Sequence, residues 1–512
     1  MLALSMRALA LVLSCSAALA SFPPSSPPPQ LAFTAPPLQP HSHSVRLAWH
    51  DRSHLERAVG LFKEHDLDVW SAGKRSSSWE TIVRWPASDD TLSEVLQRLE
   101  EAGIPPPTAS DGAQGASLDD RLSSPTFLPS FSRSLSAATL ANLSRSSLPP
   151  TLDDPVHNTY HPYDGIHDLL LSFEKSYPDF VKVFSLGQSS EGRDIWAVKV
   201  TNFSSTPDEA RAASSSSALG EEEEEEDLPA VVPPPLRALS KKRHKHRRTR
   251  KLNFVVAGTQ HAREWIAAST SLYLIHDLLA VEPGEGQRKA EKARERLLSQ
   301  VEFTFVPVVN PDGYVYSWDV DRLWRKSRQP VGKDCFGIDL NRNWGFKFEP
   351  GSRPNPCSDS FPGSSAFESV ELQVLRDYLL GSKEHPIDAF LDVHSFGQML
   401  LYPYSYSCST RTADEENQAE AVLQTARALK SVHGRQFETG SVCEVSLTSP
   451  GESLDWTYAE ARIRWSFATE LRDGGVFGFL LPPSQIRPSG EEMSAALRSL
   501  TQFILDKEAG KR

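Results

Sequence analysis

From about residue 157 to residue 507, segments in which apolar residues have the pattern of a strand alternate with segments in which they have the spacing of a helix. Short apolar runs typical of buried strands are separated by longer runs with helical spacing, such as 266–279 and 368–380. This alternation predicts an α/β domain with a mixed, mostly parallel sheet flanked by helices. The strand-like runs cover residues 181–186, 195–200, 253–257, 301–309, 390–393 and 465–471.

A second, shorter pattern occupies residues 44–106. Helical spacing at 55–62 and 92–99 is combined with strand-like runs, in the order β-α-β-β-α. This order predicts a small α+β domain of the ferredoxin-like kind. The strand-like runs are 45–49, 67–70 and 81–85.

Segments rich in Pro and Ser separate these patterns and predict disorder. We expect a disordered leader at 21–43 and a linker at 107–154, followed by the larger domain at 155–507. The linker carries candidate processing sites at Arg121, Arg133 and Arg145.

One charged insertion, at 203–250, interrupts the larger pattern. It contains an acidic block at 221–227 and a basic block at 241–250. Blocks of like charge are usually solvated and disordered, which is the interpretation we favour. The other interpretation is a basic patch that binds polyanions.

The N-terminus is typical of a secretory signal peptide at 1–20. A basic residue precedes an apolar run at 8–13, and small residues at 18–20 suit cleavage. The run is too short to span a bilayer and no other long apolar stretch exists, so we expect no membrane anchor. Asn142 and Asn202 are glycosylation acceptors, as a secretory route permits.

Cysteine content and charge agree with a secreted protein. Of the five cysteines, one lies in the signal peptide, and an even number remains, which predicts two disulfides with three connectivities. A net charge of −12 argues against general nucleic-acid binding. The remaining cysteines are Cys335, Cys357, Cys408 and Cys443.

Two histidines stand at the carboxyl ends of strand-like runs, where open α/β sheets place their ligands. His261 follows one run and has Glu264 three residues later, and His394 ends another. Two imidazoles and one carboxylate are a typical catalytic zinc set with an open position for water. The alternative is that both histidines are hydrogen-bonded polar residues without a metal.

Three further segments supply candidate chemistry. Glu470 ends another strand-like run and could take a proton from an attacking water. A guanidinium such as that of Arg325 could stabilise an oxyanion, and Asn341 with Arg342 could hold a carboxylate. In isolation each of these residues is more typical of a surface ion pair.

Together these segments resemble the zinc metallocarboxypeptidases of the pancreatic carboxypeptidase A/B type, from about residue 159 to residue 504. The region 44–106 resembles the inhibitory propeptide of that family. The resemblance implies an eight-stranded type of sheet and synthesis as a zymogen. The matching motifs are Ser190-Glu-Gly-Arg193, His261-Ala-Arg-Glu-Trp-Ile266, Asn310-Pro-Asp-Gly-Tyr314, Arg322-Leu-Trp-Arg-Lys326, Asn341-Arg-Asn-Trp344, His394-Ser395, Leu401-Tyr-Pro-Tyr404, Asp455-Trp456 and Glu470-Leu-Arg-Asp473.

The resemblance also implies roles for residues. One zinc ion would be held by His261, Glu264 and His394, with Glu470 as the general base. Arg325 would polarise the scissile carbonyl. The substrate would be the C-terminus of a peptide or protein. The remaining implied roles are terminal-carboxylate binding by Asn341 and Arg342, auxiliary substrate binding by Arg263, and a Cys335–Cys357 disulfide, which leaves Cys408 and Cys443 as the second pair.

The chain departs from the family pattern at two positions. The substrate-capping tyrosine of the family is replaced by Leu447, which cannot donate a hydrogen bond, so we expect weaker substrate binding. His-Ser-Tyr of the family reads His394-Ser-Phe396 here, which removes one hydroxyl. Leu454 stands where members specific for basic residues carry an acid, so we expect apolar or aromatic C-terminal residues to be favoured.

A second resemblance points to a fungal branch of the same family. Its members are linked to cell-wall organisation, keep the zinc ligands and are catalytically silent. They usually lack the glutamate base and the Asn-Arg anchor, whereas this chain keeps Glu470, Asn341 and Arg342. We therefore favour a secreted zinc carboxypeptidase. The alternative is a silent zinc protein of the cell wall or vacuole that binds peptides or wall components.

Overall fold

The computed structural model describes three parts of the chain. These are residues 42–109 with short gaps, residues 152 and 155–205, and residues 250–510 apart from 282–283, 352–354 and 382–384. The predicted signal peptide, the leader before residue 42, the linker with its arginines, Asn142 and nearly all of the insertion lie outside these residues, so those interpretations stay predictions.

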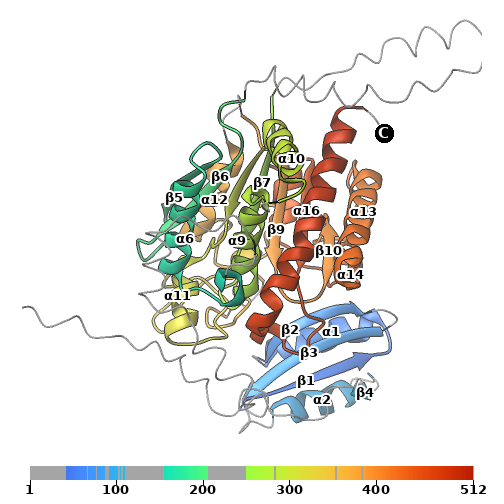
Figure 1. Ribbon diagram of the computed structural model, residues 1–512. Helices are drawn as coiled ribbons and strands as arrows, with labels where there is room; N and C mark the ends of the chain where they lie inside the picture. The colour runs from blue at the N-terminus through green and yellow to red at the C-terminus, as the bar shows by residue number, and fades with distance from the viewer. Residues whose placement is uncertain are drawn as a thin grey trace, which may run out of the picture. The chain divides into compact units, whose positions relative to one another are not determined.

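An eight-stranded mixed sheet forms the centre of residues 155–510 (Figure 1). The strands are β5 (Val181–Gln188), β6 (Asp194–Val200), β7 (Leu252–Gly258), β8 (Val301–Val306), β9 (Ala389–His394), β10 (Met399–Tyr402), β11 (Glu438–Ser441) and β12 (Trp465–Glu470). Their order is β11-β10-β12-β9-β7-β8-β6-β5. The inner strands β12, β9, β7 and β8 are parallel, while β10 is antiparallel to β12, and β6 is antiparallel to both β8 and β5. The predicted fold class is confirmed.

The inner strands form because both of their faces are covered. Every residue of β7 and β9 is buried, which explains their near-continuous apolar sequences. The prediction of a strand over 301–309 was too long, because β8 ends at Val306, directly before a proline. Strands β10 and β11 were not predicted, since four residues each are too few to show a period.

Helices cover both faces of the sheet in two separate cores. The larger core takes side chains from α6, α9, α10, α11, α13 and α16, and the smaller one takes them from α12, α14 and α15. The bounds are α6 (Tyr163–Ser176), α9 (Trp265–Leu279), α10 (Gln287–Gln300), α11 (Pro311–Asp319), α12 (Val370–Leu380), α13 (Glu415–His433), α14 (Val442–Val445), α15 (Ser453–Ala459), α16 (Ile486–Glu508) and the 3₁₀ turns Pro155–Asn158, Leu340–Arg342, Gly478–Leu480 and Pro483–Gln485.

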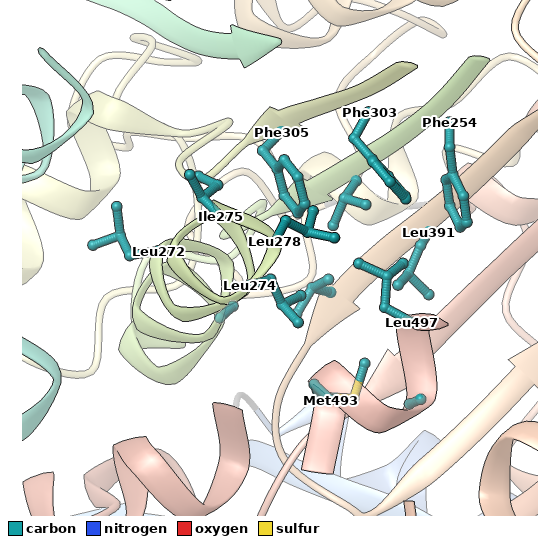
Figure 2. Packing of buried hydrophobic residues seen from close by; sticks show 14 of the residues in the cluster. Phe254, Leu272, Leu274, Ile275, Leu278, Phe303, Phe305, Leu391, Met493 and Leu497 are labelled. Carbon is teal, nitrogen blue, oxygen red and sulfur yellow. The ribbon is translucent and has the colours of Figure 1, made fainter. Parts of the chain in front are cut away.

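Helices α9 and α16 fix the strands that carry the candidate site. Figure 2 shows Leu278 of α9 beside Phe305 of β8, with Leu497 of α16 close to Leu391 of β9. All four side chains are buried. Close packing of this kind holds the carboxyl ends of β7, β9 and β12 in fixed positions.

The N-terminal part is a four-stranded antiparallel sheet with two helices. Its elements are β1 (Ser42–Trp49), α1 (Arg52–Glu64), β2 (Asp68–Arg75), β3 (Ser78–Pro86), α2 (Thr91–Glu101) and β4 (Thr108–Ala109), with strand order β2-β3-β1-β4. It has a hydrophobic core of its own, which includes Leu55, Phe62 and Val83. We call residues 42–109 the N-terminal domain and residues 155–510 the larger domain. Among the helices of the described residues, none combines the length and apolarity that a membrane span requires.

Candidate functional site

Three residues from two strand ends meet in a buried cluster. His261 and Glu264 lie in the turn between β7 and α9, with Glu264 directly before the helix, and His394 is the last residue of β9. His261 Nδ1 is 2.8 Å from Glu264 Oε1, and His394 Nδ1 is 3.0 Å from Glu264 Oε2. The two Nδ1 atoms are 3.2 Å apart. These three side chains are buried and could hold one metal ion together.

The outer nitrogens of both rings face carboxylates. His261 Nε2 is 3.1 Å from Asp339 Oδ1, and His394 Nε2 is 3.0 Å from Asp392 Oδ2. Metal-binding histidines usually direct their second nitrogen to such a group, which fixes the ring and its tautomer. Nitrogen and oxygen donors in this arrangement suit zinc. Neither Asp339 nor Asp392 was predicted as a site residue, although Asp392 stands two residues before His394 in one strand and so shares its face.

The buried carboxylates of the cluster are ionised. Burial raises the pKa of Glu264, but the imidazoles of His261 and His394 outweigh burial and leave that pKa below its usual value. Burial also raises the pKa of Asp339. The Arg325 guanidinium and His261 have a larger, opposite effect, so that this pKa stays well below its usual value. A charged Glu264 carboxylate is the form that can bind a metal cation.

Glu470 lies beside this cluster. It is the last residue of β12 and is in register with His394 on the parallel strand β9. Both residues line one cavity of about 810 Å³. A half-buried carboxylate at this position can accept a proton from a water in the cavity.

The predicted catalytic arginine, Arg325, and the predicted substrate-binding Arg342 have carboxylate partners within the same domain. Arg325 donates through Nε at 3.1 Å and Nη2 at 2.9 Å to Asp339 Oδ2. Arg342 donates through Nη1 to Glu452 Oε1 at 3.1 Å. Glu452 was not predicted as a site residue, because its Gly-Glu-Ser context indicates only a loop.

The apolar end of the cavity contains Leu454. This side chain is buried and belongs to the smaller core of the larger domain. The neighbouring Asp455 does not provide an acid here, because its carboxylate accepts from Ser405 N at 2.8 Å and from Tyr406 N at 2.9 Å. The apolar residues that line the cavity also include Met399, Leu401, Val442 and Ala468.

The N-terminal domain supplies one wall of the cavity. Arg263 was predicted to bind substrate, and its Nη1 is 3.1 Å from Asp68 Oδ2 and 3.4 Å from Asp359 Oδ2. Lys63 of α1 lines the same cavity. Partial desolvation by the cavity walls and the charge of Arg342 lower the pKa of Lys63 to about 8, although the side chain stays in contact with solvent.

Both departures from the family pattern lie at this wall. Leu447 packs against the core of the N-terminal domain. Phe396 belongs to a cluster with Trp70 and Ile82, in which its ring centroid is 6.4 Å from that of Trp70. Apolar side chains at these two positions therefore contribute to contact between the domains.

The remaining predicted residues lie away from the cluster. The structure joins Cys335 to Cys357 and Cys408 to Cys443, with Cα atoms 4.9 and 5.3 Å apart. Asn202 follows β6 and its Oδ1 accepts from Ser204 N at 3.0 Å. Arg250, the last residue of the basic block, forms an ion pair with Asp388 through two hydrogen bonds of 2.6 and 2.7 Å.

Comparison with known proteins places the chain among zinc carboxypeptidases. Residues 166–496 match the sequence profile of the zinc carboxypeptidase family. The inactive metallocarboxypeptidase ecm14 of Talaromyces stipitatus is 33% identical over 385 residues, which are 71% of this chain and 58% of that protein. A metallocarboxypeptidase A-like protein of Trichophyton verrucosum is 33% identical over 356 residues, which are 68% of this chain and 72% of that protein. The chain spans about half the length of the ecm14 proteins it matches.

Solved structures agree with these sequence matches. The crystal structure of thrombin activatable fibrinolysis inhibitor is 25% identical, with a TM-score of 0.64 and coverage of 91% of this chain and 99% of that one. A carboxypeptidase A from Helicoverpa armigera, 23% identical, has a TM-score of 0.65 and coverage of 90% and 98%, and shows the same fold. The predicted family resemblance is confirmed.

Proposed function

Because the chain belongs to the zinc carboxypeptidase family, we propose that it is a zinc-dependent carboxypeptidase that releases apolar or aromatic residues from peptide C-termini. The observation that supports this proposal most directly is the position of Glu470. This carboxylate is in register with His394 and lines the cavity into which the buried His–Glu–His cluster opens. The candidate metal ligands and the candidate general base therefore line the same cavity.

In this proposal His261, Glu264 and His394 hold one zinc ion, which supplies Lewis-acid chemistry when it is bound. Glu470 takes a proton from the attacking water and later gives a proton to the leaving amine. Arg325 donates to the carbonyl oxygen as it gains negative charge, while Asp339 fixes its guanidinium plane.

The rest of the cavity orients the peptide. Asn341 and Arg342 would bind the terminal carboxylate, and Arg263 would bind the chain before it. The apolar residues around Leu454 would take the last side chain, which supports a preference for apolar and aromatic residues. Leu447 offers no hydrogen bond to the peptide, in contrast to a tyrosine.

We also propose a secreted zymogen. Support comes from the signal-like N-terminus, from the two disulfides, and from the N-terminal domain, whose Asp68 engages Arg263. The protein would act outside the cell, in the cell wall or in the vacuole, on peptide or protein C-termini. Nucleic-acid partners and a membrane anchor form no part of the proposal.

A second candidate function is a silent zinc protein that binds peptides or cell-wall components and contributes to wall organisation. The ecm14 relatives are named inactive. Leu447 and the pairing of Arg342 with Glu452 favour this candidate too, because both weaken recognition of a peptide end.

Release of C-terminal residues from a mixed peptide panel decides between the two candidates. The zinc-loaded protein, cleaved by limited proteolysis in the linker, is compared with its Glu470→Ala variant. If the proposal is right, the variant loses about 10²–10⁴-fold of the activity and keeps its zinc, since a general base contributes that much. Equal and negligible release by both zinc-containing proteins would establish the silent candidate.

A further inference from the structure

Arg342, the proposed binding residue for the terminal carboxylate of a peptide, is already paired with a carboxylate of the protein itself. Glu452 Oε1 is 3.1 Å from Nη1 of Arg342, and the same Nη1 donates to Asn341 O at 2.5 Å. Glu452 is only 8% exposed, so this pair is not a solvated surface ion pair. Both Arg342 and Glu452 line the cavity that contains the zinc ligands.

The backbone holds Glu452 in this position. Gly451 O accepts from Trp344 N at 3.1 Å, and Ser453 N donates to Asn341 Oδ1 at 2.9 Å. Gly451 has φ +76°, and a Cβ at this position would meet Arg342 O at 2.3 Å, so the two segments approach as closely as only glycine allows. These contacts hold the backbone of Glu452 beside Arg342.

Glu452 occupies the N-cap position of α15, and its side chain makes no capping hydrogen bond to the helix. The carboxylate instead reaches Arg342, whose charge offsets part of the cost of burying it.

A terminal carboxylate of a peptide needs the same guanidinium. Arginine binds carboxylates through charge-assisted hydrogen bonds, and a carboxylate tethered beside it acts at a high effective concentration. A peptide carboxylate bound at Arg342 would also lie close to the charge of Glu452, in a cavity where like charges repel strongly.

We infer that Glu452 is an internal ligand of Arg342 and a specificity-determining residue that lowers the preference of the cavity for a free terminal carboxylate. Apolar chain ends whose carboxyl group is amidated then bind about as well as free acids. The inference rests on the proposed binding of peptide ends in this cavity, but it concerns binding and not turnover.

Affinity for a matched acid and amide tests the inference. The probes are N-acetyl-L-phenylalanine and N-acetyl-L-phenylalaninamide, which fit a cavity of about 810 Å³ and differ only at the carboxyl group. The protein is the full chain with Glu470→Gln, so that no probe is turned over. Titration calorimetry measures each dissociation constant with and without Glu452→Gln, which keeps the size and removes the charge.

The expected result is a gain in affinity for N-acetyl-L-phenylalanine alone. Glu452→Gln tightens binding of the acid about tenfold or more, because one charge-assisted hydrogen bond becomes available to it, and leaves binding of the amide unchanged. Adding Arg342→Gln to Glu452→Gln abolishes this gain. The matched control is Glu371→Gln, a buried glutamate that bonds Ser190 and Ser369 away from the cavity and should alter neither affinity.

Other results overturn the inference. If Glu452→Gln changes the dissociation constants of acid and amide equally, the pair has a structural role. If neither dissociation constant changes, or if no variant binds either probe, Glu452 does not set selectivity. If Glu452→Gln does not fold, Glu452→Ala carries the same expectation. Failure of the proposed hydrolysis is separate, because it is measured as product release by protein with Glu470 intact.

Discussion

Asp339 Oδ1 lies 3.1 Å from His261 Nε2, on the ring nitrogen that does not face Glu264. The other oxygen of the same carboxylate accepts both hydrogen bonds from Arg325. One buried side chain therefore orients a candidate metal ligand and the candidate oxyanion donor together. Asp392 has the first of these functions for His394.

Replacing either outer carboxylate should weaken zinc binding. We expect Asp339→Asn and Asp392→Asn to lower zinc affinity about 10–100-fold, because the imidazoles lose an acceptor that fixes their orientation. Competition with a zinc-selective fluorescent chelator measures the change. The control is Asp312→Asn, a buried aspartate that pairs with Arg193, and an equal loss in this variant would point to general unfolding.

Leu454 should control which C-terminal residue is released. Leu454→Asp places a carboxylate in the apolar end of the cavity, so release of apolar residues should fall about tenfold or more, and release of Lys and Arg should appear. A peptide panel with varied last residues measures both. The isosteric Leu454→Asn lacks the charge and should not gain basic residues, and a gain by both variants would contradict the assignment.

Leu447 should help to keep the N-terminal domain bound to the rest of the protein after the linker is cut. Its partly buried side chain packs against the core of that domain, so Leu447→Ala should cost about 1 kcal/mol of association. This corresponds to roughly fivefold weaker binding of the cleaved domain, measured by size-exclusion chromatography at several concentrations. Leu423→Ala, on the exposed face of α13 with 49% exposure, should change nothing. Unaltered association in the Leu447 variant would remove this residue from the interface.

Lys63 should make stability depend on alkaline pH. Its pKa is about 8 in the folded protein, below the ordinary 10.5. The unfolded chain therefore binds more protons between these values, and the free energy of unfolding should rise with pH from about 8 to about 10.5. Water reaches Lys63 in the cavity, so the rise is smaller than the full shift implies. Thermal midpoints from pH 7 to 10 test this, and a matching slope in Lys63→Met would refute it.

The sequence predicted elements where burial leaves a long apolar signature. Strands β7, β9 and β12 and helix α9 were recognised because their runs are nearly continuous or regularly spaced. Strands β10 and β11 have four residues each, and their pairing depends on β12 rather than on their own composition. Tertiary contact, not local preference, makes them strands.

The candidate site also contains some residues that could be predicted from the sequence and others that could not. His261, Glu264, His394 and Glu470 follow apolar runs, so their place at the strand ends could be predicted. Glu452 and Arg342 are 110 residues apart in the chain, and Asp68 and Arg263 are 195 apart. No spacing rule connects residues so distant, because only the folded backbone brings them together.

The carboxylate partners of the arginines also affect how quickly ligands arrive. Arg263, Arg325 and Arg342 each have a carboxylate oxygen within 3.1 Å, so the field of each guanidinium is largely cancelled a few ångströms away. An anionic chain end approaching from solvent gains little electrostatic acceleration. Its association rate constant should stay near the unsteered range of about 10⁵–10⁶ M⁻¹s⁻¹ and change little with ionic strength.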